Sequence, residues 1–197
     1  MTPSNKLLWG VLMLVFGLGV AGLVWPSSAT TEGTAVSLPV EMVADYVHAV
    51  IEADREVYTR AVVERMQAKG VVVASENWEQ KNTLPLPAQF LMESGRVLAK
   101  KGIGIQYKLI SLWPINKRNV ASSELEKTGM GTVLTHPTKP HTGFVKEGGA
   151  RYFQAIYPDL AVTQACIGCH NAHPDSPKRD FKINDVMGAI VINIPVK

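Results

Sequence analysis

The chain has 197 residues, 46% of them hydrophobic, so it is long enough to bury the core of one ordinary domain and to carry an additional segment. Its formal net charge of +3 arises from 20 basic and 17 acidic residues that are spread along the sequence. Because dense blocks of lysine and arginine are missing, we expect no nucleic-acid partner.

The N-terminus is dominated by an apolar run from Leu7 to Trp25 that contains no charged residue. This run is longer than the apolar region of a cleaved signal peptide and close to the ~20 residues needed to cross a membrane. Tryptophans near both of its ends are typical of membrane interfaces. We therefore predict that residues 1–25 form a transmembrane anchor. The alternative is a secretory signal peptide cleaved after Ala29, and in both cases the rest of the chain is exported.

The segment 26–39 is small, polar and bounded by prolines, which predicts a flexible linker. No repeat or low-complexity tract follows, so residues 40–197 are expected to form one domain. Its first element is predicted to be an amphipathic helix from Val40 to Lys69, because apolar residues recur at helical spacing and Gly70 follows.

Further along the chain, a short helix is predicted over residues 88–101 and three strands over residues 105–116, 150–158 and 186–196. The last strand is almost continuously apolar and is therefore expected to be central in its sheet. These elements predict an α+β domain in which helices pack against an antiparallel sheet.

Both cysteines of the chain lie in the stretch "TQACIGCHNAHP", which is expected to form a short helix capped by Asp159 and ended by Pro174. The order Cys166-x-x-Cys169-His170 is the attachment pattern of c-type haem, in which two thiols bind the porphyrin covalently and the histidine ligates the iron. Cysteines one helical turn apart can reach one edge of the macrocycle. The sequence thus predicts one covalently attached haem c.

Chance explains this pattern poorly. Two randomly placed cysteines would have this spacing in about 1% of cases, and a following histidine lowers the figure to roughly one in four thousand. The other interpretations are a redox-active dithiol or disulfide and a zinc site. A zinc site usually needs a second pair of ligands that the sequence lacks, and a redox pair usually begins the helix of a βαβ unit.

The second axial ligand of the iron is less determined by the sequence. The candidates are His48, His136, His141, His173, Met187, or no ligand at all. His48 is favoured because a rigid helix distant in sequence can deliver it across the haem, although a polar helix flank is also the ordinary place for a surface histidine. Arg55 lies on the same row as His48 and is predicted to bind a haem propionate, or alternatively to pair with the exposed Glu52.

At this point the chain resembles the single-haem c-type proteins with a PAS-like fold, which are proposed to be exported haem-based redox sensors. The resemblance covers most of residues 40–197 and rests on three successive blocks, "YKLISLWPINKRN" (107–119), "ARYFQAIYPDLAVTQACIGCH" (150–170) and "FKINDVMGAIVINIP" (181–195). It implies a PAS-like sheet, attachment through Cys166 and Cys169, and His170 as the proximal ligand. Members of that family can use a cysteine of the first helix as the distal ligand, which this chain cannot supply, so His48 or a vacant position takes its place.

Two strong axial ligands would leave no coordination position for a substrate, which favours one-electron transfer or redox sensing over catalysis. We therefore expect a membrane-anchored monohaem cytochrome on the periplasmic face of the inner membrane, not an enzyme. No output segment follows Lys197, so we expect it to act with a redox partner or as an accessory subunit of a membrane complex. The alternatives are a sensor of nitric oxide or carbon monoxide and a haem enzyme of the peroxidase type.

Overall fold

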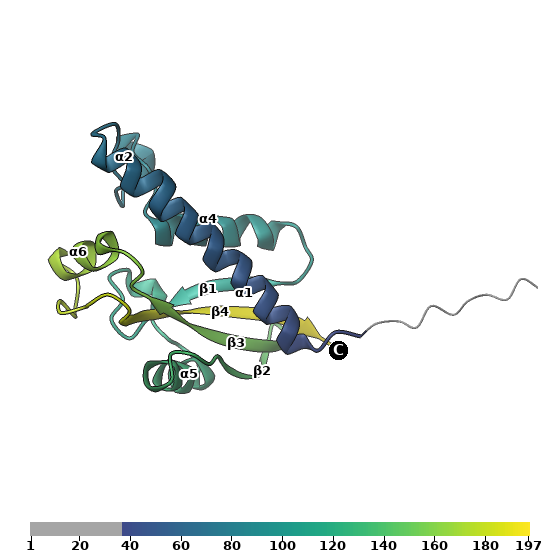
Figure 1. The fold of residues 1–197 in the computed structure, drawn as a ribbon. Helices are drawn as coiled ribbons and strands as arrows, with labels where there is room; N and C mark the ends of the chain where they lie inside the picture. The colour runs from purple at the N-terminus through teal and green to yellow at the C-terminus, as the bar shows by residue number, and fades with distance from the viewer. Residues whose placement is uncertain (1–36) are drawn as a thin grey trace, which may run out of the picture. The chain divides into compact units, whose positions relative to one another are not determined.

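The computed structural model describes residues 37–197. Its elements, in chain order, are α1 (Val40–Val57), the π-helix η1 (Tyr58–Glu64), α2 (Arg65–Ala68), α3 (Trp78–Lys81), α4 (Pro87–Lys100), β1 (Gln106–Ile110), the short 3-10 helix η2 (Lys117–Asn119), α5 (Glu124–Thr135), β2 (His141–Glu147), β3 (Ala150–Leu160), α6 (Gln164–Ala172) and β4 (Val186–Val196) (Figure 1).

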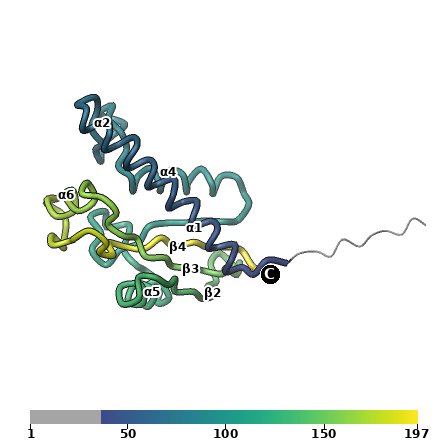
Figure 2. The backbone as a smooth tube through the Cα atoms, in the orientation of Figure 1, coloured from purple at the N-terminus to yellow at the C-terminus, as the bar shows by residue number. Residues whose placement is uncertain are grey.

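The four strands form one antiparallel sheet in the order β1-β4-β3-β2. Helices α1 and α4 lie on one side of this sheet and α5 on the other, as Figures 1 and 2 both show. This arrangement confirms the predicted α+β class with an antiparallel sheet and flanking helices. The predicted membrane anchor lies outside the described residues, and within residues 37–197 no helix is long and apolar enough to cross a membrane.

Strand β4 is central because both of its faces are covered. Its alternate residues Ile190, Ile192 and Ile194 pack with Phe153 of β3 in a core beneath α1 and α4. On the other face of β4, Val186, Ala189 and Val191 pack in a second core beneath α5. Coverage of both faces accounts for the unbroken apolar run that predicted a central strand, and that prediction is confirmed.

The long first helix is continuous through α1, η1 and α2 and ends where the sequence predicts. Gly70 has a φ of +63°, a left-handed conformation that glycine adopts without steric cost. The Gly70 and Val71 amides donate to the carbonyls of Gln67 and Met66, so the last turn is closed by a Schellman motif. This helix can therefore present a long, regular face to the rest of the domain.

Two longer elements, α5 and β2, and the short helices α3 and η2 were not predicted from the sequence. Ser123 caps α5 by accepting a bond from the Glu126 amide at 3.1 Å, and the Glu126 side chain accepts bonds from the Ser122 and Ser123 amides. Strand β2 begins at His141, one of the candidate axial ligands. Both elements lie away from the cysteine motif, on the α5 side and at one edge of the sheet.

Candidate haem site

The cysteine motif lies on α6, which follows β3 after a short turn. The predicted cap is wrong: Asp159 belongs to β3, and the helix is instead preceded by Thr163 in an extended conformation. The Thr163 hydroxyl lies 3.4 Å from the Cys166 sulfur. Strand β3 continues to Leu160, because its pairing with β4 extends through Asp159 and Leu160 across a local irregularity in register.

The residues after the motif fold back and hold α6 in place. The Asn171 side chain bonds both backbone groups of Phe181, donating to its carbonyl at 2.9 Å and accepting from its amide at 3.0 Å. The Phe181 ring meets the His170 ring edge to face at a centroid distance of 5.9 Å. This contact orients the His170 imidazole. Phe181 lies nine residues beyond Ala172, the last residue of α6.

His173, a candidate ligand, instead ties α6 to the segment before α3. Its Nδ1 accepts the Asp175 amide at 3.1 Å, which leaves the proton on Nε2, and Nε2 lies 3.2 Å from the Glu76 carboxylate. His136 and His141 are also engaged elsewhere, beside the hydroxyls of Thr135 and Thr132. The structure does not bring His136 or His141 to the motif, and the nearby His173 is held by Glu76.

One cavity of about 740 Å³ receives the whole motif. Its volume lies within the range of cofactor pockets. The residues that line it include Cys166, Cys169 and His170 of α6, Arg55, Thr59 and Val63 of the first helix, Met92 of α4, Trp113 and Asn119 of the segment after β1, Asp159 of β3, and Met187 and Gly188 of β4. The two thiols and the imidazole thus face walls that come from several separate parts of the fold.

The π-helix explains how the first helix lines this cavity over several turns. A π-helix has more residues per turn than an α-helix. A helix that combines the two forms therefore keeps residues four apart close to one face. Arg55, Thr59 and Val63 have this spacing, and all three line the cavity. The Thr59 hydroxyl donates to the Arg55 carbonyl at 2.7 Å, which satisfies a side chain that is only 2% exposed.

Arg55 lies on the cavity wall and forms an ion pair with Asp159, which also lines the cavity. The two side chains are only 12% and 15% exposed. Burial opposes the charge on Arg55, but the Asp159 carboxylate raises the pKa of the guanidinium above its ordinary value. Arg55 therefore presents a permanent positive charge at the cavity, and the exposed pairing with Glu52 is not the contact it makes.

His48, the favoured second ligand, has a different environment. Its ring stacks on Tyr157 with centroids 3.9 Å apart and planes 9° from parallel, and it is not among the residues that line the cavity. Its Nε2 is buried and has no hydrogen-bond partner among residues 37–197. Burial lowers the pKa of His48, so its imidazole is neutral at pH 7.

The electrostatics of the motif suit metal ligation by His170. Burial lowers the pKa of His170, which gives the neutral imidazole that binds metals. Burial, followed by the charge of Glu76, raises the pKa of the Cys169 thiol, so this sulfur is not activated as a nucleophile. Within residues 37–197, no three His, Cys, Asp or Glu side chains are grouped to hold a metal ion, which leaves a zinc site without its ligands.

Two thioethers, Met92 and Met187, line the same cavity. Met187 was a sequence candidate, and it is 7% exposed in a cluster with Phe181 and Cys166. Met92 was missed, because a methionine in an amphipathic helix carries no sign that it faces a cavity rather than the core. The Asn119 amide lies 3.8 Å from the Met92 sulfur.

These observations define an α+β domain whose C-x-x-C-H helix lines a partly open cavity. The Tll0287-like family model matches residues 30–195, which include the whole domain up to its last two residues. The chain belongs to this family. The matched range contains the three blocks on which the sequence resemblance rests. A solved structure, that of the cyanobacterial haem protein Tll0287, is 14% identical with a TM-score of 0.46, over 80% of this chain and 97% of that one. No curated protein matches the sequence.

Proposed function

We propose that this chain is a haem protein in which Cys166 and Cys169 attach one haem covalently and His170 is an axial ligand. The observation that carries the proposal is that all three residues of the motif line a single cavity of about 740 Å³. Membership of a family named for Tll0287, a protein described as a haem protein, supports haem binding. The PAS-like character of the sheet belongs to the same proposal and rests on the sequence resemblance.

The residues present fit such a group. The His170 imidazole is neutral, and its buried Nδ1 has no hydrogen-bond partner in the described structure. Trp113, Leu109 and Met187 supply apolar walls. Arg55 provides a positive charge that Asp159 stabilises, and it would hold a propionate by a charge-assisted bond. The walls therefore offer apolar surface for a porphyrin and a positive charge for one of its propionates.

When bound, the haem would supply a one-electron redox centre. The protein contributes the enclosure, the axial imidazole and the charge at the cavity wall. We propose on this basis that the chain transfers electrons or senses redox state, rather than acting as an enzyme. Its partner would be a redox protein or a membrane complex, and it would work on the periplasmic face of the inner membrane with residues 1–25 as its anchor.

A gas-binding sensor is the second candidate function, and one observation favours it. The four residues of the first helix that line the cavity are Arg55, Thr59, Val63 and Gln67, none of which is a strong iron ligand. His48, from the same helix, stays a predicted ligand that would have to leave its stacking on Tyr157 to reach the cavity. A weakly occupied sixth position would admit nitric oxide or carbon monoxide.

Carbon monoxide distinguishes these two functions. The full-length chain, produced in a host that attaches haem c, is reduced and exposed to carbon monoxide while its absorption spectrum is recorded. An unchanged spectrum together with reversible one-electron reduction supports electron transfer. An immediate shift to a carbonyl complex contradicts tight six-coordination and supports gas sensing. An electron paramagnetic resonance spectrum of the oxidised protein, compared with His48→Ala, Met92→Leu and Met187→Leu, identifies the ligand.

A further inference from the structure

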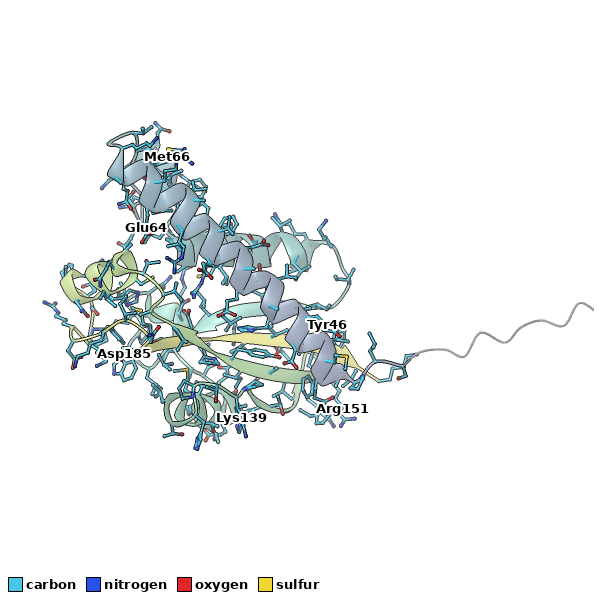
Figure 3. All side chains as sticks on the ribbon, in the orientation of Figure 1. Tyr46, Glu64, Met66, Lys139, Arg151 and Asp185 are labelled. Atoms are coloured by element: carbon cyan, nitrogen blue, oxygen red, sulfur yellow. The ribbon has the colours of Figure 1, made fainter. Side chains whose placement is uncertain are left out.

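The cavity wall carries two thioethers that could complete the coordination of a haem iron. Outside the motif, the part of the wall formed by residues 37–197 contains no histidine, cysteine, tyrosine or lysine, but it does contain Met92 and Met187. A methionine opposite a histidine is a common ligand pair of c-type haem. Figure 3 shows side chains projecting between the first helix, near the labelled Glu64, and the strand ends, near the labelled Asp185. The choice among the lining residues is therefore between two methionines.

Met187 lies on the side of the cavity that carries the motif. Its side chain packs with Phe181 and with Cys166 and Ile167 of α6. The Phe181 ring in turn contacts the His170 ring. The two axial ligands of a haem iron approach from opposite faces of the porphyrin. A methionine packed against the helix of the first ligand is therefore in place for packing and not for ligation from the opposite face.

Met92 reaches the cavity from a different wall. Helix α4 packs on β1 through a buried face that includes Leu91 and Gly95, and a Cβ added at Gly95 would lie only 3.1 Å from the Tyr107 carbonyl oxygen. Met92 is partly buried next to this face, against the core that α4 shares with the first helix. Ala88, one helical turn before Met92, also lines the cavity. The packing of α4 thus turns Met92 toward the cavity from a wall that does not carry the motif.

A fixed amide holds the Met92 sulfur. The Asn119 Nδ2 donates to the Met92 Sδ at 3.8 Å, and Asn119 also lines the cavity. The backbone of Asn119 is bound on both sides, because its amide donates to the Asn116 carbonyl at 2.9 Å and its carbonyl accepts the Ser111 amide at 2.8 Å. A thioether sulfur has a second lone pair, so one hydrogen bond orients it and leaves it able to bind a metal.

We propose that Met92 is the second axial ligand of the haem and that Asn119 is a positioning residue that holds its sulfur. This inference rests on the proposed function, because it requires a haem attached to the motif. Met92 takes the place of the predicted ligand His48, which would have to leave its stacking on Tyr157. A methionine ligand raises the reduction potential of a haem, and a hydrogen bond to the sulfur raises it further by drawing electron density from the ligand.

Optical and NMR spectra of the full-length chain with haem c attached test this assignment. A methionine ligand gives ferric haem a weak far-red absorption band, and in the reduced protein its methyl resonance is shifted strongly upfield by the porphyrin ring. We expect both signals in the wild type and their loss in Met92→Leu. The matched controls Met187→Leu and His48→Ala should keep both signals. Asn119→Leu should keep the far-red band and lower the reduction potential, because the donor to the sulfur is lost.

The outcomes separate this inference from the proposed function. A chain that carries haem but lacks both signals, or a Met92→Leu variant that keeps them, would overturn ligation by Met92 and leave haem attachment intact. An unchanged reduction potential in Asn119→Leu would overturn the positioning role. If Met92→Leu fails to hold haem, the upfield methyl must persist in Met187→Leu, and its loss there would overturn the assignment. A chain with the mass of the bare polypeptide would contradict the proposed function itself.

Discussion

At the wall of the haem site, Arg55 and Asp159 form the most buried ion pair of the described structure. Removal of one partner leaves the other charged, largely out of water and without compensation. We predict that Arg55→Met lowers the free energy of unfolding by about 2 to 4 kcal/mol, a value reduced from that of a fully buried pair because both side chains keep some solvent access. Urea unfolding followed by circular dichroism measures this loss.

A control for this prediction lies one turn away on the same helix. Arg60 pairs with Glu56 at 2.8 Å, but these side chains are 54% and 49% exposed. We expect Arg60→Met to change the free energy of unfolding by less than about 1 kcal/mol, because exposed pairs contribute little. Equal losses in the two variants would show that the Arg55–Asp159 pair has no special structural role.

Glu126 is a second residue whose charge contributes to stability. Its side chain is 3% exposed, and it accepts bonds from Lys108 at 2.8 Å and from the Ser122 amide at 2.8 Å. Burial alone would raise its pKa, but these bonds outweigh burial and lower the pKa of Glu126 below its ordinary value of 4.5. Its contribution is therefore fully present above pH 4.5 and is lost as the pH falls through the lowered pKa.

We predict that Glu126→Gln lowers the free energy of unfolding at pH 7 by about 1 to 3 kcal/mol, because the bonds to an ionised carboxylate are lost. This difference from wild type should shrink when unfolding is measured at successively lower pH, below 4.5. The exposed Glu147→Gln serves as the control. A difference between wild type and Glu126→Gln that stays constant over this range would contradict the assignment of the ionised form.

At the residue scale, the sequence predicted what is local and missed what the fold brings together. Cys166, Cys169 and His170 could be recognised because their chemistry requires a fixed spacing within one helical turn. Asp159 was assigned to a cap because its partner, Arg55, lies 104 positions earlier in the chain. Met92 could not be recognised, because only the packed structure shows that its helix faces a cavity.

Among the elements, α5 offers the sharpest test of packing against the sheet. A Cβ added at Gly129 would lie 2.4 Å from the Ile156 Cδ1, and it would also crowd the Ile156 Cβ and the His141 ring at 3.3 Å. We predict that Gly129→Ala destabilises the domain by about 1 to 3 kcal/mol, because the helix must move away from β3 or the isoleucine must adopt a strained rotamer.

Gly131 provides the matched comparison on the same helix, since a Cβ there would meet no atom within 4 Å. Gly131→Ala should stabilise the domain by about 0.5 to 1 kcal/mol, because alanine loses less backbone entropy in a helix. Thermal unfolding of the two variants side by side measures both effects. A neutral or stabilising Gly129→Ala would contradict close packing of α5 on β3.

Sequence periodicity predicted the elements with strong apolar patterns and missed those without. The first helix, α4 and β4 bury clear apolar faces, and their predicted bounds agree with the structure to within two residues. Helix α5 contains two glycines and only a weak apolar face, so its pattern was inconspicuous. The sequence "SELE" at Ser123 is a capping-box signal that could have revealed its start. Edge strand β2 is mostly polar and follows a proline-rich loop.

For the whole molecule, the order β1-β4-β3-β2 places the ends of β3 and β4 next to the motif helix. The Ala161 amide donates to the Asp185 carbonyl, and the Asn184 amide donates to the Ala161 carbonyl, so the two strand ends are joined where α6 begins. The first helix and α4 complete the cavity from the other side. Sequence reasoning reached the α+β class and the motif, but a cavity assembled from several distant segments required the three-dimensional structure.

The central claim is that the motif cysteines hold a haem covalently, and the intact mass of the denatured full-length chain tests it most directly. The protein is produced in a host with haem c maturation, unfolded, and compared with the Cys166→Ala/Cys169→Ala variant and with His173→Ala as a control. We predict that the wild type and His173→Ala carry the added mass of one haem and that the double cysteine variant has the mass of the bare polypeptide. A wild-type chain with the mass of the bare polypeptide would contradict covalent attachment.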